Sequence, residues 1–267
     1  MIIGKAISPL TLRKRNGTDA DAQAFITATG ISGTNATATN KLVIDLKAAN
    51  IWTKMKAVYP MVGGTATTCK YNLKDPRDLN AAFRLNFVGG WTPSATGMTP
   101  NGVNAYADTF FAPNIETDGT SHYSFYSRTN VAASAVVFGC NSVGPNYYYT
   151  TLNPRNLSNQ CTNAINENTG EVFPNSSSLG LFTLNRQNAN DYDVWINSTK
   201  QINTTKLALG RSAFKIYLGA LNGAGTASNF STNECAFFTA GLPLTDAEAL
   251  ALYNAVNTFQ VTLGRNV

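Results

Sequence analysis

Acidic and aromatic residues alternate in the segment "NDYDVWIN", residues 190–197. In an extended strand, Asp191, Asp193 and Trp195 share one face, because successive side chains point to opposite sides. An exposed tryptophan beside carboxylates would form a platform for a sugar ring and its hydroxyl groups. Two alternatives stay open: Trp195 packs in the core against the other sheet, and the aspartates either bind a cation or simply face solvent.

Three consecutive tyrosines, Tyr147, Tyr148 and Tyr149, occur in "GPNYYYTT". In a strand, three consecutive side chains place at least one ring on each face. We therefore expect one of these rings to be exposed at a binding surface or a subunit surface, where tyrosine is common.

The residues that catalysis requires do not occur in a catalytic pattern. Glycoside hydrolysis needs two carboxylates that flank the scissile bond, whereas Glu167 and Glu171 are four residues apart in the turn-rich "NENTGEVFP" and are interpreted as solvated loop acids. His122 is the only histidine, and no nucleophile elbow accompanies it. The sequence therefore predicts no catalytic residues and a protein that is not an enzyme.

The four cysteines, Cys69, Cys140, Cys161 and Cys235, are scattered and form no Cys-x-x-Cys pair. With a single histidine, this pattern predicts no metal site and no cofactor. We interpret the cysteines as small buried residues. A Cys140–Cys161 disulfide in oxidising surroundings stays open as the alternative.

Charged residues make up only 13% of the 267 residues, and hydrophobic residues make up 43%. A surface built from uncharged polar side chains suits a repeated assembly or an extracellular protein, and it equally suits an Asn- and Thr-rich β-protein. The net charge of +5 includes one basic cluster, Arg13, Lys14 and Arg15. This cluster is either a solvated terminus or an arm that anchors the chain to an acidic partner.

Several classes of partner are not expected. Nucleic-acid binding needs a dense basic face with stacking aromatic residues, and the sequence has none. No apolar run approaches the roughly 20 residues of a membrane-spanning helix, and the first residues contain no signal-peptide core of about 7–15 apolar residues. We therefore expect a protein made in the cytosol that does not insert into a membrane.

The residue pattern divides the chain at about residue 60. One helix is expected from an N-cap at Thr18 to a stop at Gly30, and a second over residues 39–58, closed by Pro60. From residue 61, short β-rich runs alternate with Gly, Asn and Pro, which is typical of an antiparallel sandwich. Residues 1–60 are thus predicted to be an arm and helical segment that anchors the chain or packs on the sandwich, and residues 61–267 the sandwich itself.

The segment "LPLTDAEALALYNAV" predicts a closing helix over residues 245–263. Thr245 and Glu248 form a capping box, in which each side chain bonds the other residue's backbone amide. The apolar positions recur at steps of three and four residues, and they are Leu252, Tyr253, Val256, Phe259 and Leu263. This face must dock on a sheet or on the N-terminal helices.

The order of the strand motifs resembles that of concanavalin A-like lectin and laminin-G-like jelly-roll domains, over roughly residues 85–263. The motifs are "GMTPNGVNAYADTFF", "SHYSFYSRTN", "GLFTLNRQNANDYDVWINSTKQ", "IYLGALNGAG" and "ECAFFTAGLPLTDAEALALYNAV". Two features depart from the family pattern: Asn197-Ser198 replaces Asn-Gly in one turn, and the strand before the closing helix is apolar at residues 236–239. The apolar strand indicates deeper burial or contact with another subunit.

The whole chain also resembles phage virion proteins that carry this domain. The resemblance implies a mainly β protein, an antiparallel jelly-roll sandwich with N-terminal helices and a C-terminal capping helix. It further implies a virion structural protein, assembled in the host cytoplasm and displayed on the capsid or tail as a decoration or fibre-type component. Its expected partners are other virion proteins and further copies of itself. The alternative is a carbohydrate-binding receptor-recognition protein that binds a cell-surface glycan.

Overall fold

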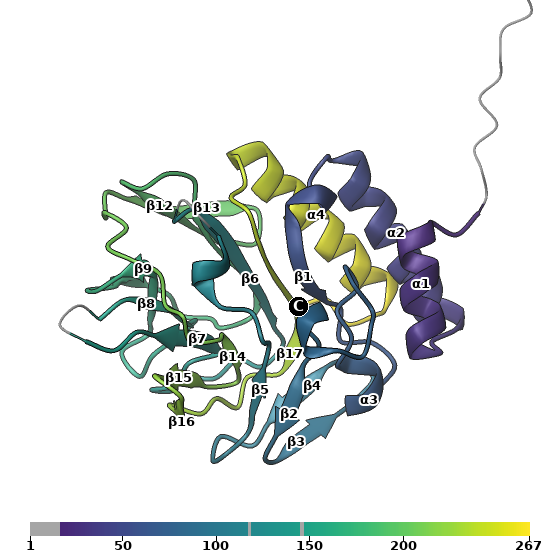
Figure 1. Cartoon of the computed structure of the whole chain (residues 1–267), viewed down its shortest axis with the longest axis horizontal. Coiled ribbons are helices and arrows are strands. Elements are labelled where there is room, and N and C mark those ends of the chain that lie inside the picture. Colours follow the sequence, from purple (N-terminus) through teal and green to yellow (C-terminus); the bar gives the residue numbers. More distant parts are fainter. Residues whose placement is uncertain (1–16, 117–118, 145–146) are drawn as a thin grey trace, which may run out of the picture.

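Two β-sheets face each other and form a sandwich (Figure 1). The computed structural model describes residues 17–116, 119–144 and 147–267. The first sheet has eight strands in the order β13-β12-β11-β6-β17-β4-β3, with β1 paired to β17. Its strands are β1 (Met55–Tyr59), β3 (Trp91–Pro93), β4 (Met98–Pro100), β6 (Ser121–Ser127), β11 (Gly180–Arg186), β12 (Tyr192–Ile196), β13 (Thr199–Thr204) and β17 (Cys235–Gly241).

The second sheet has nine strands in the order β10-β9-β8-β7-β14-β5-β2, with β15 and β16 attached at β7. Its strands are β2 (Asn86–Val88), β5 (Tyr106–Asp108), β7 (Phe138–Asn141), β8 (Tyr149–Asn153), β9 (Gln160–Glu167), β10 (Glu171–Pro174), β14 (Tyr217–Leu218), β15 (Leu221–Gly223) and β16 (Thr226–Ser228). Strand β15 runs parallel to β7, and the other pairings between the named strands are antiparallel. The predicted mainly β antiparallel sandwich is thus confirmed.

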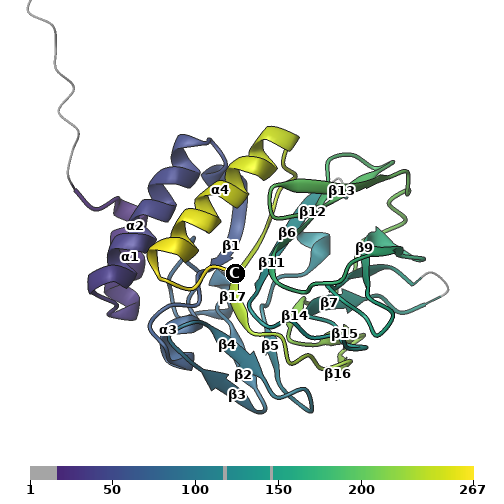
Figure 2. The same cartoon turned by 180° about the vertical axis from the view of Figure 1, so that it is seen from behind.

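Helices α1, α2 and α4 form a third layer on the outer face of the eight-stranded sheet (Figures 1 and 2). The helices of the structure are α1 (Ala20–Thr29), α2 (Gly33–Ala48), α3 (Ala66–Cys69) and α4 (Asp246–Thr262), with 3-10 turns η1 (Trp52–Lys54), η2 (Asn80–Ala82) and η3 (Pro113–Ile115). Within the described ranges, no helix has the length and apolar content needed to cross a membrane.

Strands β6, β11 and β17 are buried along their whole length. Alternate side chains serve two cores, because a strand directs them to opposite faces. In β6, Tyr123 and Phe125 pack between the two sheets, and Tyr126 packs against the helix layer. In β17, Phe238 belongs to the inter-sheet core and Phe237 to the helix side. The apolar strand at residues 236–239 therefore reflects deeper burial within the chain.

The closing helix forms as the sequence predicts. Thr245 Oγ1 accepts from the Glu248 amide at 3.3 Å, and the Thr245 amide donates to Glu248 Oε2 at 2.7 Å. Lys54, on η1, adds an ion pair to the same carboxylate at 2.5 Å. Leu252, Val256 and Phe259 are buried against the sheet and the other helices. Local capping and the apolar face agree, so the sequence alone determines this element.

The N-terminal helices differ from the prediction in three respects. Asp19, and not Thr18, is the N-cap of α1, and its carboxylate accepts from the Asp21 amide at 3.0 Å. Helix α2 begins at Gly33 and ends at Ala48, so the predicted helix over 39–58 is wrong after residue 48. Residues 55–59 form β1, which pairs with β17. The eight-stranded sheet therefore starts before residue 60.

Arg265 ties the C-terminal end of the chain to distant backbone. Its guanidinium is buried and donates to the carbonyl oxygens of Pro60 (2.6 Å), Met61 (2.7 Å) and Ala236 (2.9 Å). Burial lowers the pKa of the group to about 10, so it remains protonated at neutral pH. Arg265 thus ties three segments of the chain together.

We expect Arg265→Met to lower the free energy of unfolding by about 3 kcal/mol or more, because several buried carbonyl groups lose their donor at once. Urea unfolding followed by fluorescence measures the change. Arg77→Met is the matched control, since Arg77 is exposed and forms a surface ion pair with Asp75, and its unfolding midpoint should stay close to that of the parent. Equal midpoints for the two variants would contradict this role of Arg265.

Candidate functional site

Trp195 does not form the exposed platform that the sequence suggested. Its side chain is 8% exposed and belongs to the core between the eight-stranded sheet and the helices. The Lys200 ammonium lies 5.3 Å from the ring centroid and covers it. The helix layer docks on this face, so a sugar ring cannot stack there. The alternative interpretation is right that Trp195 packs in a core, but its packing partners are the helices and not the other sheet.

The two aspartates near Trp195 hold the local structure. Asp193 is 2% exposed and accepts from Asn203 Nδ2 at 2.6 Å and Gln187 Nε2 at 3.1 Å, with the Lys200 ammonium at 3.2 Å. Asp191 accepts from Asn188 Nδ2 at 2.8 Å within a turn. The expectation that both face solvent is wrong for Asp193. Asp193 thus links β12 to β13 through Asn203, and Asp191 holds the turn between β11 and β12.

The three tyrosines lie in different environments. Tyr147 is 53% exposed, which confirms that one ring reaches solvent. Tyr148 packs flat against the backbone of Gly210, where an added Cβ would lie 2.4 Å from Tyr148 Cε2. Tyr149 begins β8 and lines a pocket. Of the six carbohydrate-binding residues that the sequence suggested, only Tyr149 reaches this pocket.

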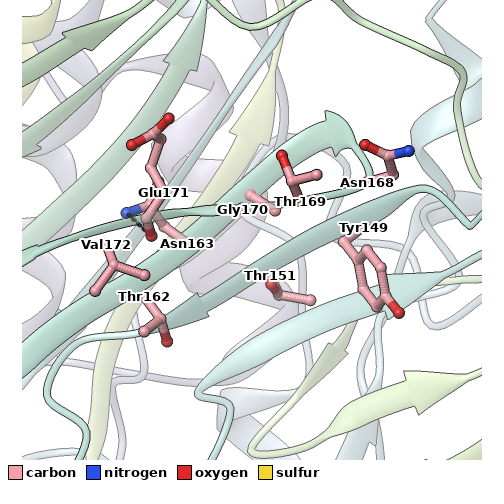
Figure 3. A pocket seen from close by; sticks show the side chains of 10 residues that line it. Tyr149, Thr151, Thr162, Asn163, Asn168, Thr169, Gly170, Glu171 and Val172 are labelled. Atoms are coloured by element: carbon pink, nitrogen blue, oxygen red, sulfur yellow. Dashed lines mark hydrogen bonds between the residues drawn. The ribbon is translucent and has the colours of Figure 1, made fainter. Parts of the chain in front are cut away.

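The pocket has a volume of about 410 Å³ and lies over strands β8, β9 and β10 (Figure 3). Antiparallel pairing sets its floor, because Thr151 lies opposite Ala164, and Thr162 opposite Val172. The lining residues are Tyr149, Thr151, Thr162, Asn163, Ala164, Asn168, Thr169, Gly170, Glu171 and Val172. Its volume is within the usual range for small-molecule sites, roughly 300–1,000 Å³.

Four polar side chains of the pocket have no hydrogen-bond partner among the described residues. They are Tyr149, Thr151, Thr162 and Asn168. Together they offer three hydroxyl groups and one amide, which can both donate and accept. Tyr149 adds an aromatic face at one end, and Val172, 52% exposed, adds an apolar contact at the other.

The loop at the rim of the pocket is held in place by Glu167. This carboxylate is buried and accepts from the Thr169 amide and the Gly170 amide, each at 2.7 Å. Gly170 has φ +70°, and a Cβ there would lie 3.1 Å from the Asn163 carbonyl oxygen, so a side chain would be strained in this turn. The expectation of solvated loop acids is therefore wrong for Glu167, which orders the rim.

Glu171 is turned away from the pocket floor. Its Oε1 accepts from Thr204 Oγ1 at 2.9 Å and lies 3.2 Å from the Lys206 ammonium. Figure 3 shows its carboxylate on the side away from the Thr162 and Val172 side chains. The two glutamates thus hold the structure around the pocket, and their carboxylates do not form a pair aimed into it.

Sequence reasoning missed Thr151, Thr162 and Asn168. The signal was the period-two pattern of "YYTTLN" and "QCTNAI", which places Tyr149 with Thr151 and Thr162 with Ala164 on the outer face of their strands. That pattern does not reveal which two strands are neighbours, so it could not bring the two threonines together.

The remaining reactive side chains lie in the cores. Cys69, Cys140, Cys161 and Cys235 are buried free thiols, which confirms the interpretation as buried residues. Burial raises the pKa of Cys69 to about 11 and of Cys140 and Cys161 to about 12. Within the described part of the chain, no group of three or more His, Cys, Asp or Glu residues could hold a metal ion. The basic cluster Arg13, Lys14 and Arg15 lies outside the described residues.

Comparisons with known proteins show the fold. The botulinum neurotoxin serotype D binding domain matches with a TM-score of 0.53 and 11% identity, over 77% of this chain and 52% of that one. A mutant of Trypanosoma rangeli sialidase that displays trans-sialidase activity matches with a TM-score of 0.50 and 11% identity, over 82% and 39% of the two chains. These structures carry lectin-like β-sandwiches, as this chain does.

A third match is a botulinum neurotoxin type C structure whose reported subject is cell entry dependent on two ganglioside molecules. Its TM-score is 0.50 and its identity 14%, over 78% of this chain and 53% of that one. The chain spans 39% to 53% of the length of these three structures. No protein-family model and no curated protein sequence matches it. The matches include a sialidase and binding domains, so the fold is compatible with both activities.

His122 provides a pH dependence of stability. The imidazole is buried, its Nδ1 lies 2.6 Å from the Leu242 carbonyl oxygen, and its Nε2 lies 3.2 Å from Thr239 Oγ1. The pKa is lowered to about 4, chiefly by desolvation and also by the nearby Lys54 ammonium, while the Leu242 carbonyl and the Glu248 carboxylate oppose the shift. The folded chain therefore binds fewer protons than the unfolded chain between pH 6.5 and about 4.

We expect the stability that this histidine contributes to be present above pH 6.5 and to fall by about 3 kcal/mol as the pH drops to 4. Urea unfolding at several pH values measures the loss. His122→Gln removes the titrating group, so its stability should decline less over the same range, with the remaining decline due to carboxylates. Parallel pH profiles for the parent and the variant would contradict the assignment.

Proposed function

We propose that this chain is a glycan-binding domain and that the pocket over β8, β9 and β10 is its ligand site. The observation that carries the proposal is a set of four polar side chains around one pocket that have no hydrogen-bond partner among the described residues, namely Tyr149, Thr151, Thr162 and Asn168. A sugar ring has alternating hydroxyl groups and an apolar C–H face, which match hydroxyl, amide and aromatic groups in such an arrangement.

The rim loop is held in one conformation, which supports binding without a large rearrangement. Glu167 fixes the backbone of Thr169 and Gly170 before any ligand arrives, and a site formed in advance avoids part of the entropy cost of binding. The ganglioside dependence reported for the botulinum neurotoxin type C structure supports a glycan as the class of ligand for a sandwich of this shape.

The contacts of Glu167 and Glu171 support binding rather than catalysis. A hydrolase of glycosides needs two carboxylates about 5–10 Å apart that face the scissile bond. Glu167 is engaged with the rim backbone, and Glu171 is engaged with Thr204 and Lys206. Neither carboxylate is free to act on a sugar in this pocket.

A second candidate function is display on a phage particle, as a decoration or fibre-type component on the capsid or tail. Its support is the placement of α1, which lies on the opposite side of the molecule from β8 and β9 (Figure 1). Attachment through the N-terminal region to other virion proteins, or to further copies of this chain, would leave the pocket accessible. Detection in purified particles by mass spectrometry supports this role, and a strictly monomeric protein absent from particles contradicts it.

The ligand site is tested with Tyr149→Ala and the matched control Tyr147→Ala, which removes the same side chain two residues outside the pocket. A glycan array finds the ligand, and titration calorimetry then measures its affinity. We expect Tyr149→Ala to weaken binding about tenfold or more, because the ring supplies the stacking face, and Tyr147→Ala to leave it nearly unchanged. Glycan binding that both variants retain equally would place the site elsewhere.

A further inference from the structure

The one charged side chain among the lining residues of the pocket makes its contacts on the side away from the pocket floor. Of the ten residues that line the pocket, Glu171 alone carries a formal charge. Its carboxylate lies against Thr204 and Lys206, at the place where β10 at the edge of one sheet meets the end of β13 at the edge of the other. The charged side chain thus joins the two sheets instead of facing a ligand.

Lys206 has no donor left for a ligand. An ammonium group has three protons, and its Nζ lies 2.6 Å from Thr169 Oγ1, 2.9 Å from the Gly170 carbonyl oxygen and 3.2 Å from Glu171 Oε1. These contacts hold the rim loop against the strand. A ligand carboxylate could reach this ammonium only by breaking contacts that keep the rim in place.

Two further charged side chains below the rim also form hydrogen bonds with the chain itself. Glu167 is buried and bonds the rim amides. Arg186 is buried and donates to the carbonyl oxygens of Ile165 (2.9 Å) and Lys206 (2.6 Å). Among the described residues, both of these cations therefore donate their protons to groups of the chain itself. An anionic ligand would lose its hydration without gaining an ion pair.

We propose that the pocket selects uncharged glycans and discriminates against sialylated and sulfated ones. The inference rests on the proposed function and adds the class of sugar. The ligand's hydroxyl groups bond Thr151, Thr162 and Asn168, its apolar face lies on Tyr149, and Val172 contacts a methyl or methylene group. The preference differs from the ganglioside dependence reported for the neurotoxin structure, because it follows from side chains of this chain and not from the shared fold.

The test uses the full chain and an array on which each neutral oligosaccharide is printed beside its terminally sialylated and sulfated forms. We expect every bound neutral glycan to exceed its acidic forms about tenfold or more in affinity. Calorimetry of the tightest neutral ligand should show a Kd that changes less than about twofold between low and high salt, since no ion pair is there to be screened.

A charge-introducing variant tests the cause. Val172→Lys places an ammonium group at the exposed wall of the pocket and should raise affinity for the acidic forms about fivefold or more, with fluorescence-detected unfolding unchanged. Val103→Lys adds the same charge at an exposed position outside the pocket and should leave the preference as it is. An equal shift in both variants would mean that net charge, and not the pocket, sets the selectivity, and this would overturn the inference.

The two proposals fail in different ways. Acidic glycans that bind as tightly as their neutral forms, with Tyr149→Ala still weakening binding, overturn the selectivity and leave the glycan site in place. An array without any bound glycan overturns the glycan site and the selectivity together.

Discussion

The central strands of the eight-stranded sheet are buried on both faces, and most of the structure follows from this constraint. A sheet of this kind needs a second sheet on one side and a further apolar layer on the other. Helix α4, α1 and α2 provide that layer, and β1 extends the sheet beside β17. The helices consequently cover the outer face of the central strands β6, β11 and β17. The open strand surface with the pocket belongs to the other sheet, at β8, β9 and β10.

Two buried arginines connect segments that are far apart in the sequence. Arg265 joins the backbone of Pro60 and Met61 to that of Ala236, and Arg186 joins β9 to the segment after β13 through the carbonyl oxygens of Ile165 and Lys206. Carbonyl dipoles replace carboxylates as partners, which satisfies the buried cation without a second desolvated charge. Arg186 thereby fixes Lys206, and Lys206 fixes the rim of the pocket.

The sequence was sufficient to predict elements whose capping signals and apolar periodicity agree. It was not sufficient where pairing between distant segments decides the secondary structure. The capping box at Thr245 and the face with Leu252 and Val256 predicted α4 well, since both signals lie within one element. Residues 55–59 continue an apolar pattern compatible with a helix, but pairing with β17 makes them a strand. Trp195 alternates as an exposed platform would, yet a helix encoded some fifty residues later covers it. The position of the pocket likewise could not be predicted, because it depends on which strands become neighbours in the sheet.

In the proposed glycan site, residues of similar type take two different roles. Thr169 and Glu171 bond to Lys206 and hold the rim. Thr151 and Thr162, on the outer face of the floor, have hydroxyl groups without a partner in the part of the chain that the structure describes. If a charged side chain faced the floor, its own hydration would compete with a neutral ligand for the same space. Turning Glu171 toward the other sheet removes that competition and closes the sandwich edge at the same time. The contacts of Glu171 with Thr204 and Lys206 thus serve both the sandwich edge and the neutrality of the pocket.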